Sequence, residues 1–530
     1  MTRILCITLS VLFSLHLAAG SGTGSDSVSP DGKPGTLLPA SSKEKNLALF
    51  INALLEQDPV RRAEKLLDVA AAAPGSAAVP LEAFRTTLKK IKNPAPLLPK
   101  FNKLWEANPE NLYIALHGAE LNRYFRTPAD VRLKQLQPVL NVTPAKLWST
   151  YTYNWKSNST TLLLINGADC YISSGKNEKL IELFDKWFQA PPAHKLSACL
   201  ILGPLCHTIA AREYALGNSE RGKALEARFE KALAEINKQS ASVTENETAW
   251  AIAAFYGKYR KILGKMPVDF AKSFYNRVRS ANANLLRLSV GTECGAPEVV
   301  ESAVSEIHAF NPRFDATEHR FKALLNAGKF SEAEKEIAKA PEKNHFDMLK
   351  RLCLFKKDWK RLHALLAAHL QKGAPADAEI GVLLLSASER LSDVSLYRQG
   401  VQILTPHLEI PLIANSVGYV GAVLNQNLDN CYKLLLAALQ KEPGNYAYLD
   451  SIAWVCYKQK RYAEAEKWIK KSFMHAAPAE GMAVIFDHAG DIAAALGKNP
   501  RTYYELSLKY APFDEEIDKE ALVKKLKALK

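Results

Sequence analysis

Apolar residues recur at helical spacing along almost all of this 530-residue chain. Leu47, Ile51, Leu54 and Leu55, for example, stand at positions i, i+4, i+7 and i+8 and would share one face of a helix. Proline and glycine interrupt the pattern roughly every ten to twenty residues, the usual length of helices in paired-helix arrays. A short extended piece is left open only at 147–153. The pattern predicts an all-α protein.

Several segments predict two helices joined by a tight turn. They are Thr161–Ser174 with Glu178–Phe188, Leu196–Leu216 with Ser219–Gln239, Phe314–Asn326 with Phe330–Ala340, and His345–Phe355 with Trp359–Leu370. Each helix has one apolar stripe that needs a neighbour, so an α-solenoid of paired antiparallel helices is the simplest arrangement. The last stretch, 513–530, has leucines on one face and lysines on the other, as a capping helix requires. A basic helix on a membrane surface is the alternative interpretation.

A fixed period is readable between 412 and 478. The matching positions are Tyr419 and Ala453, Cys431 and Ala465, and Ala438 and Ser472, each pair 34 residues apart. A period of 34 residues is that of the tetratricopeptide repeat, TPR. Small residues at such positions let two helices approach closely.

The segment Tyr446–Pro478 resembles the TPR family, with Ile452 and Ala453 at the family's Leu–Gly pair and Ala465 at a small-residue position. A further copy is expected at 482–512, although its second helix, Arg501–Tyr510, lacks the expected small residue. The expected organisation is a signal peptide at 1–20, a flexible Gly/Ser/Pro linker at 21–43, divergent TPR-like helical repeats at 44–305, TPR repeats at 306–512, and a capping helix at 513–530.

The beginning of the chain has the pattern of an export signal. Arg3 precedes an apolar run, Ile4–Ala19, and the small residues Ala18, Ala19 and Gly20 suit cleavage. We therefore expect a periplasmic or secreted protein, and retention of the run as a membrane anchor is the alternative. Peripheral association with a membrane or the cell envelope is also left open.

Composition and motifs argue against several classes of function. The net charge of +14 is spread along helix faces, and no nucleic-acid-binding module is recognisable. Seven cysteines remain after Cys6 of the leader, widely spaced and without a CxxC pair, so neither a disulfide framework nor a zinc site is expected. The P-loop-like spacing at Gly217–Lys223 is followed by Ala224, which lacks the hydroxyl that would hold Mg²⁺. We predict no catalysis, cofactor or metal.

The resemblance to the TPR family implies a concave groove that holds a protein or peptide. Carried over by position, its side chains are Asp450, Trp454, Tyr457, Lys458, Asp487 and Asp491. This acidic and aromatic set favours a basic or mixed peptide. Alternatively, Trp454 and Tyr457 simply pack against the neighbouring repeat.

A second cluster of aromatic residues supports a different hypothesis. Trp148, Tyr151 and Trp155 would share one helix face and could form a platform for a sugar or a peptide, although a packing stripe is the simpler interpretation. The primary hypothesis is thus a non-catalytic protein- or peptide-binding scaffold. The alternative is an α-helical envelope protein that binds or processes polysaccharide.

Overall fold

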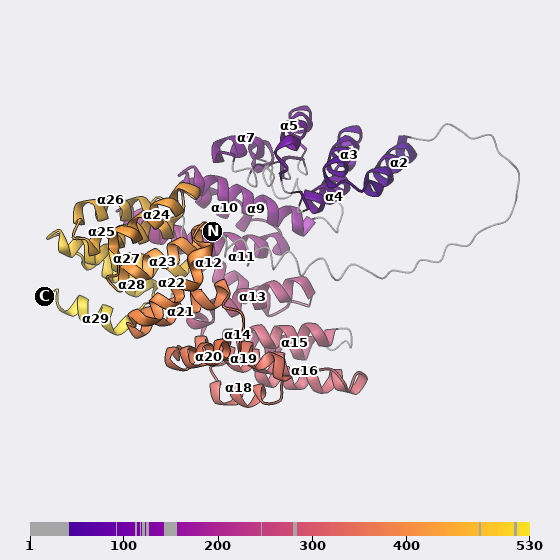
Figure 1. The fold of residues 1–530 in the computed structure, drawn as a ribbon. Helices are drawn as coiled ribbons and strands as arrows, with labels where there is room; N and C mark the ends of the chain where they lie inside the picture. Colours follow the sequence, from indigo (N-terminus) through magenta and orange to yellow (C-terminus); the bar gives the residue numbers. More distant parts are fainter. Residues whose placement is uncertain are drawn as a thin grey trace, which may run out of the picture. The chain divides into compact units, whose positions relative to one another are not determined.

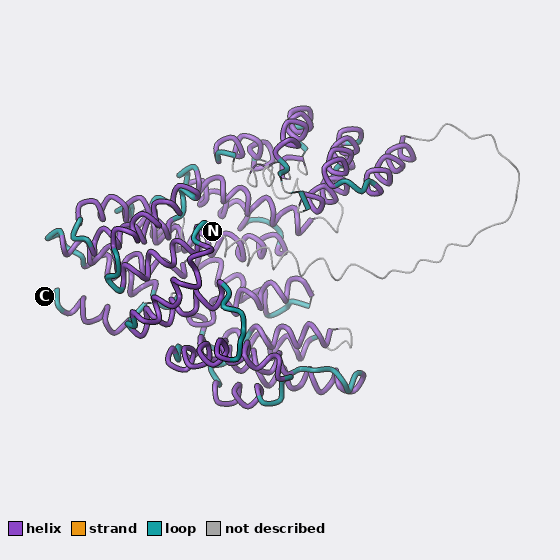
Figure 2. The backbone as a smooth tube through the Cα atoms, in the orientation of Figure 1, coloured by secondary structure: helices purple, strands orange, loops and turns teal. Residues whose placement is uncertain are grey.

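The computed structural model describes residues 42–88, 90–91, 93–111, 114–116, 118, 122, 127–141, 156–244, 246–278, 283–475, 479–513 and 517–529. Within these ranges the regular secondary structure is entirely helical (Figure 2). None of the helices described is both long and apolar enough to cross a membrane. The expected leader, most of the linker, and the aromatic residues Trp148, Tyr151 and Trp155 lie outside the described residues.

The chain divides into two compact units, with the boundary inside helices α11 and α12. The helices before the boundary are α2 (Ser42–Leu55), α3 (Pro59–Ala72), η1 (Pro74–Ser76), α4 (Ala78–Leu88), η2 (Ala95–Leu97), α5 (Leu98–Ala107), α7 (Ala129–Leu140), α9 (Lys156–Ser173) and α10 (Asn177–Phe188). Leu66, Phe84 and Phe101 lie in a core cluster of this unit and are at most 1% exposed. Helices α3, α4 and α5 thus bury their apolar stripes against one another. Helix α2 does not: Leu47, Ile51, Leu54 and Leu55 are between 44% and 66% exposed.

The second unit contains most of the chain. Its helices, counted from the boundary, are α11 (Pro192–Ala215), α12 (Ser219–Ser240), α13 (Asn246–Leu263), α14 (Met266–Arg277), α15 (Asn284–Glu293), α16 (Pro297–Phe310), α17 (Thr317–Asn326), α18 (Phe330–Ile337), α19 (Glu342–Lys356), α20 (Trp359–Gln371), α21 (Ala378–Leu391), α22 (Val394–Leu404), η5 (Thr405–His407), α23 (Pro411–Val423), α24 (Leu428–Lys441), α25 (Tyr446–Lys458), α26 (Tyr462–Phe473), α27 (Ala479–Ala495), α28 (Arg501–Tyr510) and α29 (Lys519–Lys527). Consecutive helices pack in antiparallel pairs, as in α21/α22 and α25/α26 (Figure 1). The prediction of an all-α solenoid is confirmed.

One turn geometry recurs inside the helix pairs from α9/α10 to α27/α28. Each of these turns contains a residue with positive φ: Gly175, Gly217, Gly264, Gly295, Gly328, Lys357, Ser392, Asn425, Lys460 and Gly497. A left-handed residue ends the first helix and reverses the chain direction, which glycine does without steric cost. These residues lie between 29 and 47 positions apart, from Gly328 to Lys357 and from Gly217 to Gly264 respectively. The repeat unit therefore extends well before the segment where the sequence shows a fixed period.

Small residues bring the paired helices together in the last two repeats. Ser472 is 1% exposed and its hydroxyl donates to the carbonyl oxygen of Tyr446 at 2.8 Å. Ser507 repeats this contact in the following pair, donating to the carbonyl oxygen of Ala483 at 2.7 Å. The expectation that Arg501–Tyr510 lacks a small residue was therefore wrong, because Ser507 takes that place despite the longer spacing between copies.

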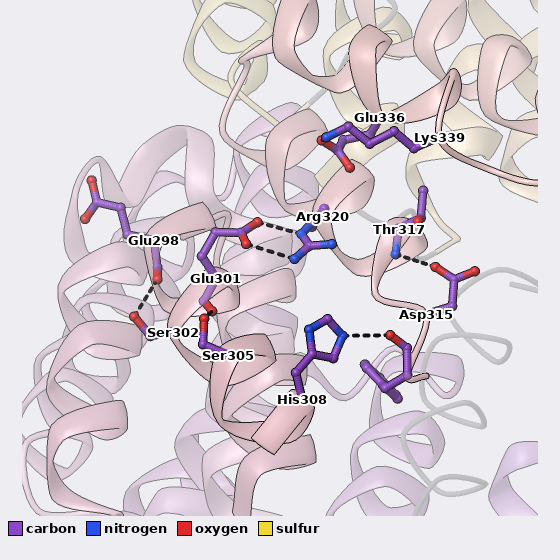
Figure 3. Close-up of polar contacts among 11 residues, drawn as sticks. Glu298, Glu301, Ser302, Ser305, His308, Asp315, Thr317, Arg320, Glu336 and Lys339 are labelled. Atoms are coloured by element: carbon purple, nitrogen blue, oxygen red, sulfur yellow. Dashed lines mark hydrogen bonds and ion pairs between the residues drawn. The ribbon is translucent and has the colours of Figure 1, made fainter. Parts of the chain in front are cut away.

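Polar side chains link neighbouring pairs across their surface (Figure 3). The guanidinium of Arg320 on α17 donates twice to Glu301 on α16, at 2.8 and 3.0 Å. At the connection between these two helices, His308 Nε2 lies 2.9 Å from the carbonyl oxygen of Phe314. The Glu301 side chain is 56% exposed, so this pair contributes at most about 1 kcal/mol and serves mainly to orient one pair on the next.

The seven cysteines of the described residues are all buried. Cys431 and Cys456 belong to the hydrophobic core of the last repeats, where each is at most 1% exposed. Burial raises the pKa of Cys456 to about 12, so its thiol behaves as a small apolar group.

Candidate peptide-binding face

The first helices of the last repeats form a closely packed row. Helices α21, α23, α25 and α27 contact one another in series, more extensively than the second helices of the same pairs do. The more closely packed row lies on the inner side of a curved array. We call the side chains of α25 and α27 that meet along this row the inner face; they are Trp454, Tyr457, Lys458, Asp487, His488 and Asp491.

Stacked rings join α25 to α27 along the inner face. The ring of Trp454 stacks on Tyr457, with centroids 4.8 Å apart, and on His488, with centroids 4.0 Å apart. The ammonium of Lys458 lies 5.1 Å from the centroid of the Trp454 ring, within the range of a cation–π contact. Trp454 is half-buried, so it packs against the neighbouring repeat and still presents part of its surface to solvent.

Asp450 lies beneath this stack. Its side chain is 8% exposed, and its two carboxylate oxygens lie 3.0 and 3.2 Å from His488 Nδ1, which donates to them. Burial lowers the pKa of His488, but the charge and hydrogen bond of Asp450 outweigh it and the net shift is upward. The residue expected to line the groove therefore supports it from below, by fixing the imidazole on which Trp454 stacks.

Two carboxylates on α27 converge on one ammonium group. Asp487 and Asp491 lie one turn apart, and Lys525 Nζ of α29 is 2.7 Å from Asp487 Oδ1 and 2.8 Å from Asp491 Oδ1. Tyr504 on α28 completes the site, because its hydroxyl donates to Asp491 Oδ1 at 2.8 Å. Lys525 Nζ also lies 5.4 Å from the centroid of the Tyr504 ring.

Burial and charge act in opposite directions in this cluster. Burial raises the pKa of Asp487, and Lys525 partly counters the shift. Burial lowers the pKa of Lys525, but the two carboxylates outweigh it and raise the net value. Burial also lowers the pKa of Lys458. The carboxylate pair therefore needs a cation nearby, and α29 supplies it.

Five of the six predicted groove residues form two connected layers, and Asp450 lies beneath them against His488. Trp454, Tyr457 and Lys458 lie in the stacked layer, and Asp487 and Asp491 form the cation site beside it. Three further residues of the site, His488, Tyr504 and Lys525, were not among the predicted groove residues. Lysines on the capping helix look like a solvated polar face in the sequence, and only the path of α29 brings one of them to α27.

Comparisons with known proteins add the following findings. No protein-family model matches the chain, and no curated protein sequence matches it significantly. Among solved structures, the maize pentatricopeptide repeat protein PPR10 is 12% identical, covers 93% of this chain and 79% of its own, and has a TM-score of 0.35. Yeast Tom70 is 13% identical, with 92% and 96% covered and a TM-score of 0.30.

The TPR domain of P58(IPK) is also 13% identical, with 86% of this chain and 99% of its own chain covered and a TM-score of 0.20. The resemblance to TPR proteins is visible in the helix pairs themselves, above all in the close approaches of α25 to α26 and of α27 to α28. The structure shows an all-α array of paired helices, and the likeness to the TPR family is carried by the sequence of the last repeats.

Proposed function

We propose that this protein is an exported, non-catalytic scaffold that holds a protein or peptide partner on the inner face of its last repeats. One observation carries the proposal: Asp487 and Asp491 hold the ammonium of Lys525 beside half-buried aromatic rings. A pair of carboxylates next to aromatic surface recognises lysine or arginine side chains through charge-assisted hydrogen bonds and cation–π contact.

The pattern at the beginning of the chain supports the export part of the proposal. A positive residue, an apolar run and small residues follow one another over the first 20 positions. Comparison of the mature N-terminus of the native protein with the residues after Gly20 tests this part. A native protein that still begins at Met1 would contradict cleavage.

Affinity capture from an envelope extract tests the binding part. We expect Trp454→Leu to lose partners that the wild-type chain captures, because it removes the ring that joins Tyr457 to His488. Trp468→Leu is the matched control: Trp468 is also half-buried, but it lies on the second helix α26, where it donates to Glu464.

The two variants lose similar ring areas, so a general loss of folding would affect both. Loss of partners in Trp454→Leu alone would locate binding on the inner face. Retention of the same partners by Trp454→Leu, at wild-type levels, would remove the inner face from the proposal.

A further inference from the structure

Helix α29 packs on α28 and buries little of its own surface. Of its residues, Leu522 alone is fully buried, at 1% exposure, and the others are half-buried or exposed. Arg501 donates to the carbonyl oxygen of Leu529 at 3.0 Å beyond the end of the helix. A helix of nine residues is not stable in isolation, so α29 depends on its packing against the array and on the pairing of Lys525.

Lys525 has the position of a ligand in a receptor site. Its Nζ bonds two carboxylates from α27 and lies near an aromatic ring from α28, so three side chains from two helices surround it. The Lys525 side chain keeps 31% exposure, whereas Asp487 and Asp491 keep 21% and 17%. The carboxylates are thus the more enclosed partners, as in a site that receives a side chain from outside.

The charge balance of the site also favours an external cation. Asp487 and Asp491 both bond the ammonium of Lys525, and the charge of Lys458 on α25 also acts on Asp491. Removing Lys525 would leave both carboxylates together in a partly buried place, which is unfavourable until another cation replaces it. Detachment of α29 and arrival of a cationic partner are therefore coupled.

We propose that α29 is an intramolecular competitor for the binding face, and that the external partner is an amphipathic helix carrying a leucine and a lysine three positions apart, as Leu522 and Lys525 are. This proposal rests on the proposed function and specifies both the partner's chemistry and its control. The partner binds when its lysine replaces Lys525 between Asp487 and Asp491. The bound α29 lowers the apparent affinity of every such partner, because only the detached fraction of the protein is competent.

A synthetic peptide of residues 513–530, labelled at its N-terminus, is the probe. It is titrated by fluorescence anisotropy, at about 0.15 M salt to screen long-range attraction, with the full wild-type chain and with the full chain carrying Leu522→Ser and Lys525→Ala. The double variant should release α29 and leave the array folded, which circular dichroism checks. We expect it to bind the peptide at least tenfold more tightly than the wild type does.

Two controls make the result specific. A peptide with Lys525→Ala keeps the other lysines and should bind the double variant at least tenfold more weakly. Adding Asp487→Asn and Asp491→Asn to the double variant should remove binding of the original peptide. Equal affinity of wild type and double variant, or equal affinity of the two peptides, would overturn the proposal.

Other occupants of the site predict different results. If α29 is exchanged between two copies, light scattering will show a dimer for the wild type and a monomer for the double variant. This result would show that α29 does not compete within its own chain. The outcome is separable from that of the proposed function. Partner capture that depends on Trp454, combined with no peptide binding by the double variant, would refute the role of α29 and leave the inner face intact.

Discussion

The close approach of α27 and α28 depends on the absence of a side chain at Gly490. A Cβ atom built there would lie 2.2 Å from Tyr504 Cε1 and 2.5 Å from Cδ1. Carbon atoms in contact are normally about 3.5 to 4.0 Å apart, so Gly490→Ala requires the Tyr504 ring to move by more than about 1 Å. The ring has little room, because Tyr504 is 4% exposed and its hydroxyl is bonded to Asp491.

The cost of Gly490→Ala follows from three contributions. Overpacking of a well-packed core costs about 1 to 3 kcal/mol, and loss of the hydrogen bond from Tyr504 to a charged group costs about 1.5 to 3 kcal/mol. Alanine in place of glycine inside a helix returns about 1 kcal/mol. We therefore expect the free energy of opening α27 and α28 to fall by about 1.5 to 5 kcal/mol, which corresponds to roughly 10- to 4,000-fold faster amide exchange.

Hydrogen exchange followed by mass spectrometry is the suitable assay, because a long repeat array need not unfold as one unit. Gly481→Ala, in the same helix, is the matched control: the nearest atom to its added Cβ is Tyr446 Cε2 at 3.6 Å, an ordinary contact. It should leave exchange in α27 unchanged or slower. Unchanged exchange in both variants would refute the argument, since Tyr504 would then be free to move.

A rescue experiment tests the cause directly. Tyr504→Leu shortens the side chain that the new Cβ would strike, so Gly490→Ala should cost much less in that background than in the wild type. Residues in contact commonly show coupling of about 0.5 to 3 kcal/mol in such cycles. Additive effects of the two substitutions would show that the loss of stability has another origin.

Three further predictions follow from other contacts. The raised pKa of His488 means that its pairing with Asp450 stabilises the fold fully below about pH 6.5 and progressively less as pH rises through the folded value. The melting temperature should therefore be lower at about pH 9 than at about pH 6, and this decrease should be larger in the wild type than in His488→Gln. An equal decrease in both proteins would contradict the prediction. Leu522→Ala should lower the free energy that holds α29 on the array by about 2 kcal/mol or more. In hydrogen exchange the amides of α29 should then lose protection, while those of α25 keep theirs. Removing the exposed ion pair by Glu301→Gln should lower the free energy of unfolding by less than about 1 kcal/mol. A larger loss would show that the contact of Glu301 with Arg320 contributes more than an exposed ion pair does.

The helical pairs were predictable because their apolar spacing and turn residues are local signals. The pairs expected around Gly175, Gly217 and Gly328 occur with only small shifts at their ends. The uniform repeat was harder to recognise, because four of its left-handed turn positions are not glycine. Lys357 and Ser392 adopt positive φ although their residue types rarely do so. The turns of this chain therefore resemble one another in backbone geometry more than in residue type.

The candidate site was predictable only in part. Position within the repeat led to Trp454, Tyr457 and Asp491, because residues on first helices recur with the period. Position within the repeat did not predict the burial of Asp450, because this burial depends on the imidazole of His488, which comes from α27. Lys525 lies on α29, a helix outside the repeat, so the period of the repeat gives no information on its position.

The position of the cation site at the last repeat has a thermodynamic consequence. The last repeat packs on α25 and α26 and also on α11 and α12, where Tyr510 donates to the carbonyl oxygen of His207 and Lys509 pairs with Glu226. Helix α29 covers a further part of its surface, at Leu522. A ligand that displaced α29 with a lysine alone would satisfy Asp487 and Asp491 but leave the surface under Leu522 open to water. Burial of a leucine is favourable by about 1.5 to 3 kcal/mol, so a competing ligand must replace this contact as well as the charge. The last repeat therefore selects helices that present both groups on one face, and simple cations or extended lysine-rich segments should compete poorly with α29.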